Sequence, residues 1–221
     1  MNIVIAPHPD DEAIGCGGTI RRHVERGEAV HVIFLTSGEK GCRGRDLAET
    51  ARTREAEAEA AKSVLGITGI EFWRQPDGSL AVTDTLVARL IRKLKEAQPD
   101  ILYVPHEREM HPDHCVAARL VSSAVSSMDH SVPNVLMYEV WTPLQQIDHV
   151  EDISEQIDLK IAAILAHKSQ CAIMRFDESA RGLARYRGEM HSWPGGPYAE
   201  VFQRLTLPVR VERSDSALPS A

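Results

Sequence analysis

NIVIAPHPDDE, residues 2–12, decides the fold of this chain and marks its most unusual chemistry. Asn2 to Ala6 is a short run with β-branched residues, which is typical of a buried strand. One histidine and three carboxylates follow it almost at once, in the segment 8–12. Buried charges are costly unless they are paired, hydrogen-bonded or bound to a cation. The stretch therefore predicts a functional site at the carboxyl end of a strand.

Outward from this strand, apolar runs alternate with longer segments of helical period. The expected strands are 2–6, 30–36, 69–73, 100–105 and 134–141, and the expected helices are 19–26, 47–65, 80–97 and 112–128. The second half is less regular, with expected helices over 154–167 and 177–189 and a late strand over 198–207. Strands joined by helices predict an α/β fold: a Rossmann-like, mostly parallel sheet with helices on both faces.

Length and composition favour one soluble domain. The chain has 221 residues, 43% of them apolar, so we expect a single domain over 1–211 and a disordered, Ser-containing tail over 212–221. The net charge of −7, without a Lys/Arg-rich block, disfavours nucleic acid and anionic membranes and favours a small-molecule partner. Four cysteines without C-x-x-C spacing predict reduced thiols and a cytoplasmic protein. Apolar runs are too short for stable membrane insertion, and a homo-oligomer is compatible with the sequence.

Two loops are expected to form the site. In open α/β sheets, ligands bind beyond the carboxyl ends of the strands, where the strand order reverses. With the common order 3-2-1-4-5, that crevice lies between residues 6–12 and the segment PHEREMHPDH, residues 105–114. The loops would bring together His8, Asp10, Asp11, His111 and His114. Two histidines, one carboxylate and an open position predict a metal site, with Zn²⁺ as the first choice and Fe²⁺ as another divalent candidate.

The H-P-D segments and the glycines that follow the first of them also allow other interpretations. Each H-P-D segment could simply begin a helix, with acidic residues favouring the positive end of the helix dipole. The glycines of GCGGT, residues 15–19, suggest a dinucleotide-binding loop, but Ile20 occupies the third glycine position of that fingerprint. We therefore expect these glycines to let the first helix approach the sheet closely.

With HPDDE near the start and HPDH after the fourth strand, the sequence resembles the PIG-L/LmbE family of zinc-dependent N-acetylglucosamine deacetylases. Further stretches support the resemblance, which covers about residues 2–205: Arg54 with Glu57, PDG at 76–78, YEVW at 138–141, HKSQ at 167–170 and AEVF at 199–202. The resemblance implies a hydrolase that removes the N-acetyl group from an N-acetylglucosamine-containing sugar or glycoconjugate.

The resemblance also implies roles for individual residues. It makes His8, Asp11 and His114 the zinc ligands, a choice between the two aspartates that spacing alone leaves open. It makes Asp10 the general base that acts on zinc-activated water. It implies that His111 assists the oxyanion or the leaving group.

Three further residues are expected around this centre. By analogy with the family, Arg54 and Asp77 bind sugar hydroxyls, although a helix-surface ion and a turn-forming P-D-G explain them equally well. Asp113 is expected to hydrogen-bond an imidazole N–H of a ligand. The segments 38–46 and 141–152 are expected to be loops that shape the pocket.

Two other functions remain open at this stage. Two histidines and one carboxylate also describe iron(II) oxygenases, although those triads usually have H-x-D spacing on β-barrels. A non-catalytic sugar-binding module on the same fold is the third hypothesis. A binder needs no general base, so the presence of Asp10 beside Asp11 argues against it.

Overall fold

The computed structural model describes residues 1–128, 133–192 and 195–206. Within these ranges the strands are β1 (Asn2–Ala6), β2 (Val30–Thr36), β3 (Gly69–Gln75), β4 (Ile101–Pro105), β5 (Asn134–Tyr138), β6 (His149–Asp152) and β7 (Ala199–Arg204). The helices are α1 (Asp11–Glu25), α2 (Leu47–Leu65), α3 (Asp84–Ala97), α4 (Pro112–Ser126), α5 (Ile157–Ala166), α6 (Lys168–Cys171) and α7 (Phe176–His191).

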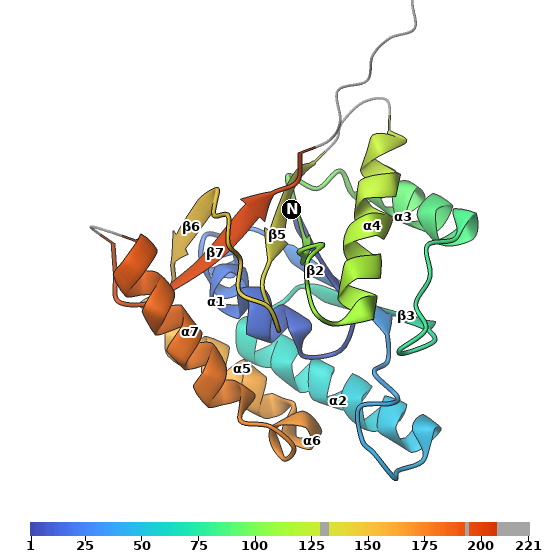
Figure 1. The fold of residues 1–221 in the computed structure, drawn as a ribbon, viewed down its shortest axis with the longest axis horizontal. Helices are drawn as coiled ribbons and strands as arrows, with labels where there is room; N and C mark the ends of the chain where they lie inside the picture. The colour runs from blue at the N-terminus through green and yellow to red at the C-terminus, as the bar shows by residue number, and fades with distance from the viewer. Residues whose placement is uncertain (129–132, 193–194, 207–221) are drawn as a thin grey trace, which may run out of the picture.

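The strands form one sheet in the order β3-β2-β1-β4-β5-β7-β6 (Figure 1). The first five are parallel and follow the expected order 3-2-1-4-5, with β1 between β2 and β4. β7 and β6 extend the sheet in antiparallel pairing beyond β5. The order therefore reverses between β1 and β4, which places the loops after these two strands in one crevice.

Helices cover both faces of the sheet, as expected. α3 and α4 lie on one face, and α1, α2, α5 and α7 lie on the other (Figure 1). The alternation of side chains along β1 divides the core in two: Ile3 and Ile5 pack in the cluster beneath α3 and α4, and Val4 and Ala6 pack in the cluster beneath the other helices. β1 is thus buried on both sides, which explains its continuous apolar sequence.

The first helix differs from the prediction, because α1 begins at Asp11 and not near residue 19. Its glycines serve close packing, as expected: a Cβ at Gly15 would lie 2.2 Å from Cδ2 of Tyr138 on β5. The helix is kinked at Cys16, whose backbone is non-helical. Three glycines and β-branched residues in so short a stretch obscure the helical period, so the predicted helix began too late.

A buried ion pair satisfies the backbone groups that the kink exposes. The Glu200 carboxylate accepts the N–H groups of Gly18 and Thr19 at 2.9 and 2.8 Å. Lys160 Nζ donates to Ile14 O at 2.7 Å and pairs with Glu200 at 2.5 Å. β7 and α5 thereby fix the bend that allows α1 to start directly after the H-P-D-D segment.

The expected loop over 141–152 is wrong at its end, because 149–152 forms β6. This four-residue strand pairs with β7 at the end of the sheet, and half of its residues are acidic. An edge strand of this kind carries no apolar alternation that the sequence could show.

The domain boundary stays a prediction. One sheet contains strands from residue 2 to residue 204, whereas the expected tail, 212–221, lies outside the described residues. In the described ranges, no helix has both the length and the apolar character needed to cross a membrane.

Candidate metal centre and active site

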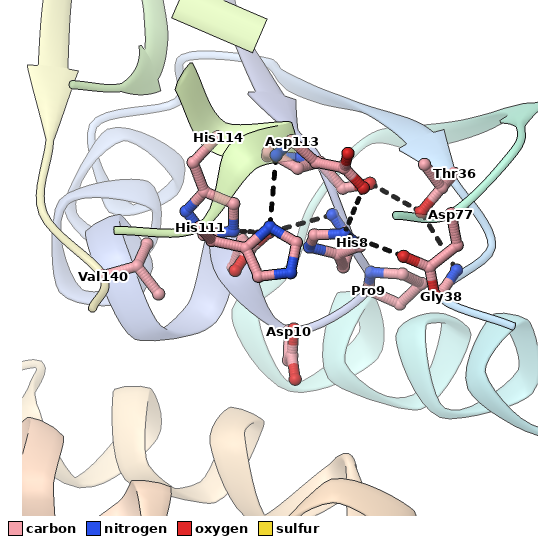
Figure 2. Close-up of polar contacts among 12 residues, drawn as sticks. His8, Pro9, Asp10, Thr36, Gly38, Asp77, His111, Asp113, His114 and Val140 are labelled. Atoms are coloured by element: carbon pink, nitrogen blue, oxygen red, sulfur yellow. Dashed lines mark hydrogen bonds and ion pairs between the residues drawn. The ribbon is translucent and has the colours of Figure 1, made fainter. Parts of the chain in front are cut away.

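The site forms where β1 and β4 end. His8, Asp10 and Asp11 follow β1, while His111 caps α4 and His114 lies in its first turn. The parallel pairing of β1 with β4 brings these loops, about a hundred residues apart in sequence, to the same edge of the sheet (Figure 2). Every residue of the predicted cluster is therefore in one place.

Three imidazoles meet at the centre of the site. The ring centroid of His8 lies 4.7 Å from that of His111 and 5.4 Å from that of His114. The centroids of His111 and His114 are 5.0 Å apart. One ring nitrogen from each lies within 4.8 Å of the others. His114 is fully buried; within the described chain its Nδ1 has no hydrogen-bond partner, and its Nε2 lies 3.2 Å from the Asp11 carboxylate without forming a regular hydrogen bond. Incomplete hydrogen bonding of a buried imidazole is costly, and a bound cation would remove that cost.

Asp11 lies between two of these rings. Its Oδ2 is 3.1 Å from His8 Nδ1 and 3.2 Å from His114 Nε2, and it accepts the His8 N–H at 2.9 Å. Burial alone would raise the pKa of Asp11, but the two imidazoles outweigh it and hold the pKa well below its usual range. An ionised carboxylate flanked by two imidazole nitrogens is a donor set that fits a divalent cation.

The other nitrogen of His8 faces two more carboxylates. Nε2 lies 3.2 Å from Asp77 Oδ1 and 3.2 Å from Asp113 Oδ2. Asp113 also accepts the N–H groups of Gly78 and Leu80, at 2.7 and 3.2 Å. The contacts of His8 Nε2 with Asp77 and Asp113 orient the His8 ring so that Nδ1 points toward Asp11. Carboxylates commonly orient metal-bound histidines in this way. His8, Asp77 and Asp113 are a second set with metal-ligand spacing, but their atoms are already engaged with one another and with the backbone.

His111 differs from the other two histidines. Its Nδ1 accepts the N–H of Asp113 at 3.2 Å, so the neutral ring carries its proton on Nε2. Burial, together with the neighbouring rings of His8 and His114, lowers the pKa of His111. The ring is thus neutral near pH 7 and offers an N–H donor rather than a lone pair at Nε2.

Asp10 is turned away from this group of histidines (Figure 2). Its backbone has φ of 130°, a conformation that residues other than glycine rarely adopt. The side chain is buried, which raises its pKa to about 6 against the opposing charge of Arg54, 3.2 Å from Oδ1. A strained backbone conformation persists only where the surrounding structure holds it, and such residues are common at functional sites.

The profile of one protein family, described as "PIG-L: GlcNAc-PI de-N-acetylase", matches residues 3–125, which include both H-P-D segments. The chain belongs to this family.

Two relatives are similar to this chain over most of its length. A probable N-acetyl-alpha-D-glucosaminyl L-malate deacetylase 2 from Bacillus cereus is 33% identical, over 81% of this chain and 87% of the relative. A diacetylchitobiose deacetylase from Thermococcus kodakarensis is 29% identical, over 90% of this chain and 80% of the relative.

Solved structures show the same fold. An N,N'-diacetylchitobiose deacetylase from Pyrococcus horikoshii superposes with a TM-score of 0.83 and 25% identity, over 92% of this chain and 83% of the other. The 4-carboxy-2-hydroxymuconate hydratase GalB from Pseudomonas putida superposes with a TM-score of 0.82 and 24% identity, over 94% and 97%. The second likeness concerns the fold alone, so the reaction must be argued from the site.

Arg54 is not the helix-surface ion that its sequence context allows. It is buried, and its guanidinium donates to Pro9 O at 2.6 Å and to Gly38 O at 3.0 Å. A Cβ at Gly38 would lie 2.2 Å from Nη1, so this glycine makes room for the arginine. Arg54 thus links α2 to the loops after β1 and β2 while it contacts Asp10 and lines the pocket.

Asp77 serves both the turn and the site. Pro76-Asp77-Gly78 is a turn, with Gly78 at φ of 67°. The Asp77 carboxylate accepts the Lys40 N–H at 2.8 Å and lies beside His8, which lowers its pKa to about 2 although burial opposes the shift. Asp77 lines the pocket beside His8.

Sequence reasoning missed the role of two buried acids. Glu12 accepts the N–H of Asp10 at 3.0 Å with one oxygen and lies 3.3 Å from His167 Nε2 with the other, so it supports the unusual backbone of Asp10. Glu109 accepts N–H groups of Val140, Trp141 and Thr142 at 2.6–3.1 Å. Both acids lie inside the quoted motifs, but only the folded structure shows what they hold.

The resulting pocket has a volume of about 310 Å³. His8, Asp10 and Asp11 form part of its wall beside Arg54 and Asp77. Lys40, from the predicted loop 38–46, and Trp141, from the predicted loop 141–152, also line it. The pocket thus combines candidate metal ligands, His8 and Asp11, with polar side chains suited to sugar hydroxyls.

Proposed function

We propose that this protein is a Zn²⁺-dependent hydrolase that removes the N-acetyl group from an N-acetylglucosamine-containing sugar or glycoconjugate. The observation that carries the proposal is the convergence of His8, Asp11 and His114 beside a separate buried carboxylate, Asp10. Membership of the PIG-L family and the deacetylase activity of its named relatives support the same reaction. A cytoplasmic location, a homo-oligomeric state and zinc as the natural ion remain predictions.

His8 Nδ1, Asp11 and His114 Nε2 are the ligands that we assign to the ion. Asp11 Oδ2 lies 3.1 Å from His8 Nδ1 and 3.2 Å from His114 Nε2, and His8 Nε2 is occupied by Asp77 and Asp113. His111 is the less suitable third histidine, because its tautomer places a proton on the nitrogen that is free. When bound, Zn²⁺ supplies Lewis acidity toward the acetyl carbonyl and lowers the pKa of water.

The protein groups then perform the proton transfers. Asp10, as a carboxylate, accepts a proton from the attacking water, and Arg54 holds its side chain in place. The Nε2–H of His111 donates to the oxyanion that develops on the carbonyl, without any need for a cationic ring. The proton on Asp10 is available for the departing amine. Arg54, Asp77 and Gln170, which line the pocket, offer hydrogen bonds to the sugar.

A panel of N-acetylated sugars and glycoconjugates, incubated with zinc-loaded protein, tests the function by the release of acetate and free amine. We expect equimolar products and no consumption of oxygen. Oxygen-dependent turnover with Fe²⁺ would identify an oxygenase instead. Tight sugar binding without product would identify a binding module.

Asp10→Ala separates catalysis from metal binding. We expect the variant to keep its zinc, because Asp10 faces Arg54 and not the ligands, and to lose at least about 10²-fold in kcat, as removal of a general base usually does. Metal analysis and initial rates on the best substrate of the panel measure both effects. Unchanged turnover would remove Asp10 from the mechanism.

A further inference from the structure

A second hollow adjoins the candidate active site. It has a volume of about 380 Å³ and lies among α1, α5, α7, β7 and the segment after β5. Resting on the proposed deacetylase function, we propose that this hollow, called here the aglycone pocket, binds an apolar alkyl or aryl group attached to the anomeric carbon of the substrate's sugar.

The two pockets are continuous at their boundary. Ile14, Val140, Trp141, Met174 and Phe176 line both of them. Trp141 and Phe176 meet edge to face, with ring centroids 5.5 Å apart. Trp141 is 37% exposed and Met174 is 46% exposed, so the boundary lies at the surface, where one ligand can reach both pockets.

The walls of the aglycone pocket are chemically different from those of the active site. Leu183 and Ala184 of α7 and Val201 of β7 contribute apolar surface that the active site lacks. An apolar group is therefore removed from water when it enters.

The charged groups that line the aglycone pocket already have partners within the protein. Lys160 pairs with Glu200, and Glu139 forms two hydrogen bonds with Arg187 at 3.0 and 2.7 Å. Arg175 binds Asp177 through two bonds of 3.0 and 2.9 Å. A charged or strongly polar ligand group would have to break these pairs, whereas an apolar group leaves them intact.

The rim of the active site agrees with an amphiphilic substrate. Ile173 is 59% exposed and lines the active-site pocket next to Met174. Arg54, Asp77 and Gln170 line the active-site pocket and not the aglycone pocket, where the charged side chains are engaged in ion pairs with one another or with neighbours. The division of polar and apolar walls thus matches a polar sugar with an apolar substituent.

Methyl and hexyl glycosides of N-acetylglucosamine, each as both anomers, provide the test. They carry the same acetamide and differ only in the apolar group. At about 0.8 kcal/mol for each buried methylene, even partial burial of the hexyl chain predicts a kcat/KM at least about ten-fold higher for one hexyl anomer. Binding of the same glycosides is measured in parallel by calorimetry.

Two substitutions in the aglycone pocket should abolish this preference. Leu183→Asp introduces an unpaired charge, and Ser179→Trp fills the mouth from an exposed position on α7. Both should reduce the hexyl-to-methyl ratio to about one while the methyl glycoside keeps its wild-type rate. Met190→Asp is the matched control, since Met190 is exposed on the same helix and lines neither pocket.

The outcomes separate the two proposals. Equal kcat/KM and equal affinity for the methyl and hexyl glycosides in the wild type would overturn the aglycone pocket, even if both are deacetylated. Equal loss of both substrates in Leu183→Asp and Ser179→Trp would do the same. If neither glycoside is hydrolysed, the deacetylase function fails, and a hexyl-specific affinity that Leu183→Asp removes still establishes the pocket.

Discussion

The two adjacent aspartates, Asp10 and Asp11, show what a single residue's surroundings decide. Asp11 lies between two imidazoles and is held ionised, whereas Asp10 is turned toward Arg54 and has a raised pKa. The residues are neighbours in sequence, but φ of 130° at Asp10 directs their side chains differently. One dipeptide thus provides groups for the two tasks that we propose, metal binding by Asp11 and proton transfer by Asp10.

His114→Ala tests the metal centre at this scale. His114 is fully buried and, within the described chain, its main polar contact is the one between Nε2 and Asp11 Oδ2, so its loss removes a ligand and leaves the other proposed ligands in place. We expect the purified variant to contain little zinc and to show no turnover, whereas His149→Ala, at the β6 edge, should retain both. Full zinc occupancy in His114→Ala would contradict the assignment.

At the scale of elements, single acids fix the loops around the site. Glu109 follows β4, and its carboxylate holds the segment after β5 by accepting three successive N–H groups, which places Trp141 between the two pockets. Asp152, at the end of β6, accepts Ser154 N–H at 2.9 Å and Gly196 N–H at 3.0 Å. Each acid connects segments that are distant in sequence.

Glu109→Gln should loosen the Trp141 segment. The amide keeps the shape of the side chain but loses the charge and one acceptor, which costs about 2 kcal/mol in the free energy of unfolding for a buried charged hydrogen-bond group. We also expect KM to rise more than kcat falls, because Trp141 lines the pocket without reacting. Urea unfolding and steady-state kinetics measure these effects. Glu107→Gln, on the exposed part of the same loop, should change neither.

Asp152→Asn should destabilise the protein in a pH-dependent way. Burial opposes ionisation of Asp152, but hydrogen bonds from Ser154 and Gly196 and the charge of Arg22 outweigh it and lower the pKa. A depressed folded-state pKa contributes stability above the unfolded-state pKa, about 3.9, and this stability is lost as pH falls through the folded-state value. We expect a loss of about 1 kcal/mol at pH 7 that shrinks below pH 4. A pH-independent difference in unfolding free energy would show that the charge plays no part.

At the scale of the whole molecule, the site joins the two halves of the parallel sheet at its reversal point. His8 and Asp11 come from the β1 side, Asp77 from the β3 side, and Asp113 and His114 from the β4 side. A cation held there is bound only by the folded chain. Metal binding should therefore contribute to global stability.

Removal of the metal should lower the melting temperature. Free Zn²⁺ at about a hundred times its dissociation constant stabilises the folded state by about 2.7 kcal/mol, which corresponds to roughly 5–10 °C for a chain of this size. Thermal unfolding after chelation, and again after zinc is restored, measures the shift. His114→Ala should melt at one temperature with or without zinc. An equal shift in that variant would place the stabilising ion elsewhere.

By itself, the sequence determined the alternation of strands and helices and the two loops that carry the site residues. Parallel strands place all their carboxyl ends at one edge, and the common order 3-2-1-4-5, assumed for the first five strands, makes β1 and β4 neighbours there. The places of β7 and β6 in the sheet came from the structure alone. The late start expected for α1 and the loop expected over 149–152 were wrong, since glycine-rich helices and short polar edge strands carry little periodic signal.

Only the tertiary structure decided the contacts of Arg54, Glu12 and Glu109 and the existence of the aglycone pocket. Each depends on side chains from elements far apart in sequence, whose distances no local pattern records. The burial of Arg54 also depends on a distant residue. Arg54 lies on a helix of charged and alanine residues and is buried only because Gly38 leaves space for its guanidinium. The sequence supplied the chemical groups, and packing determined which of them face one another.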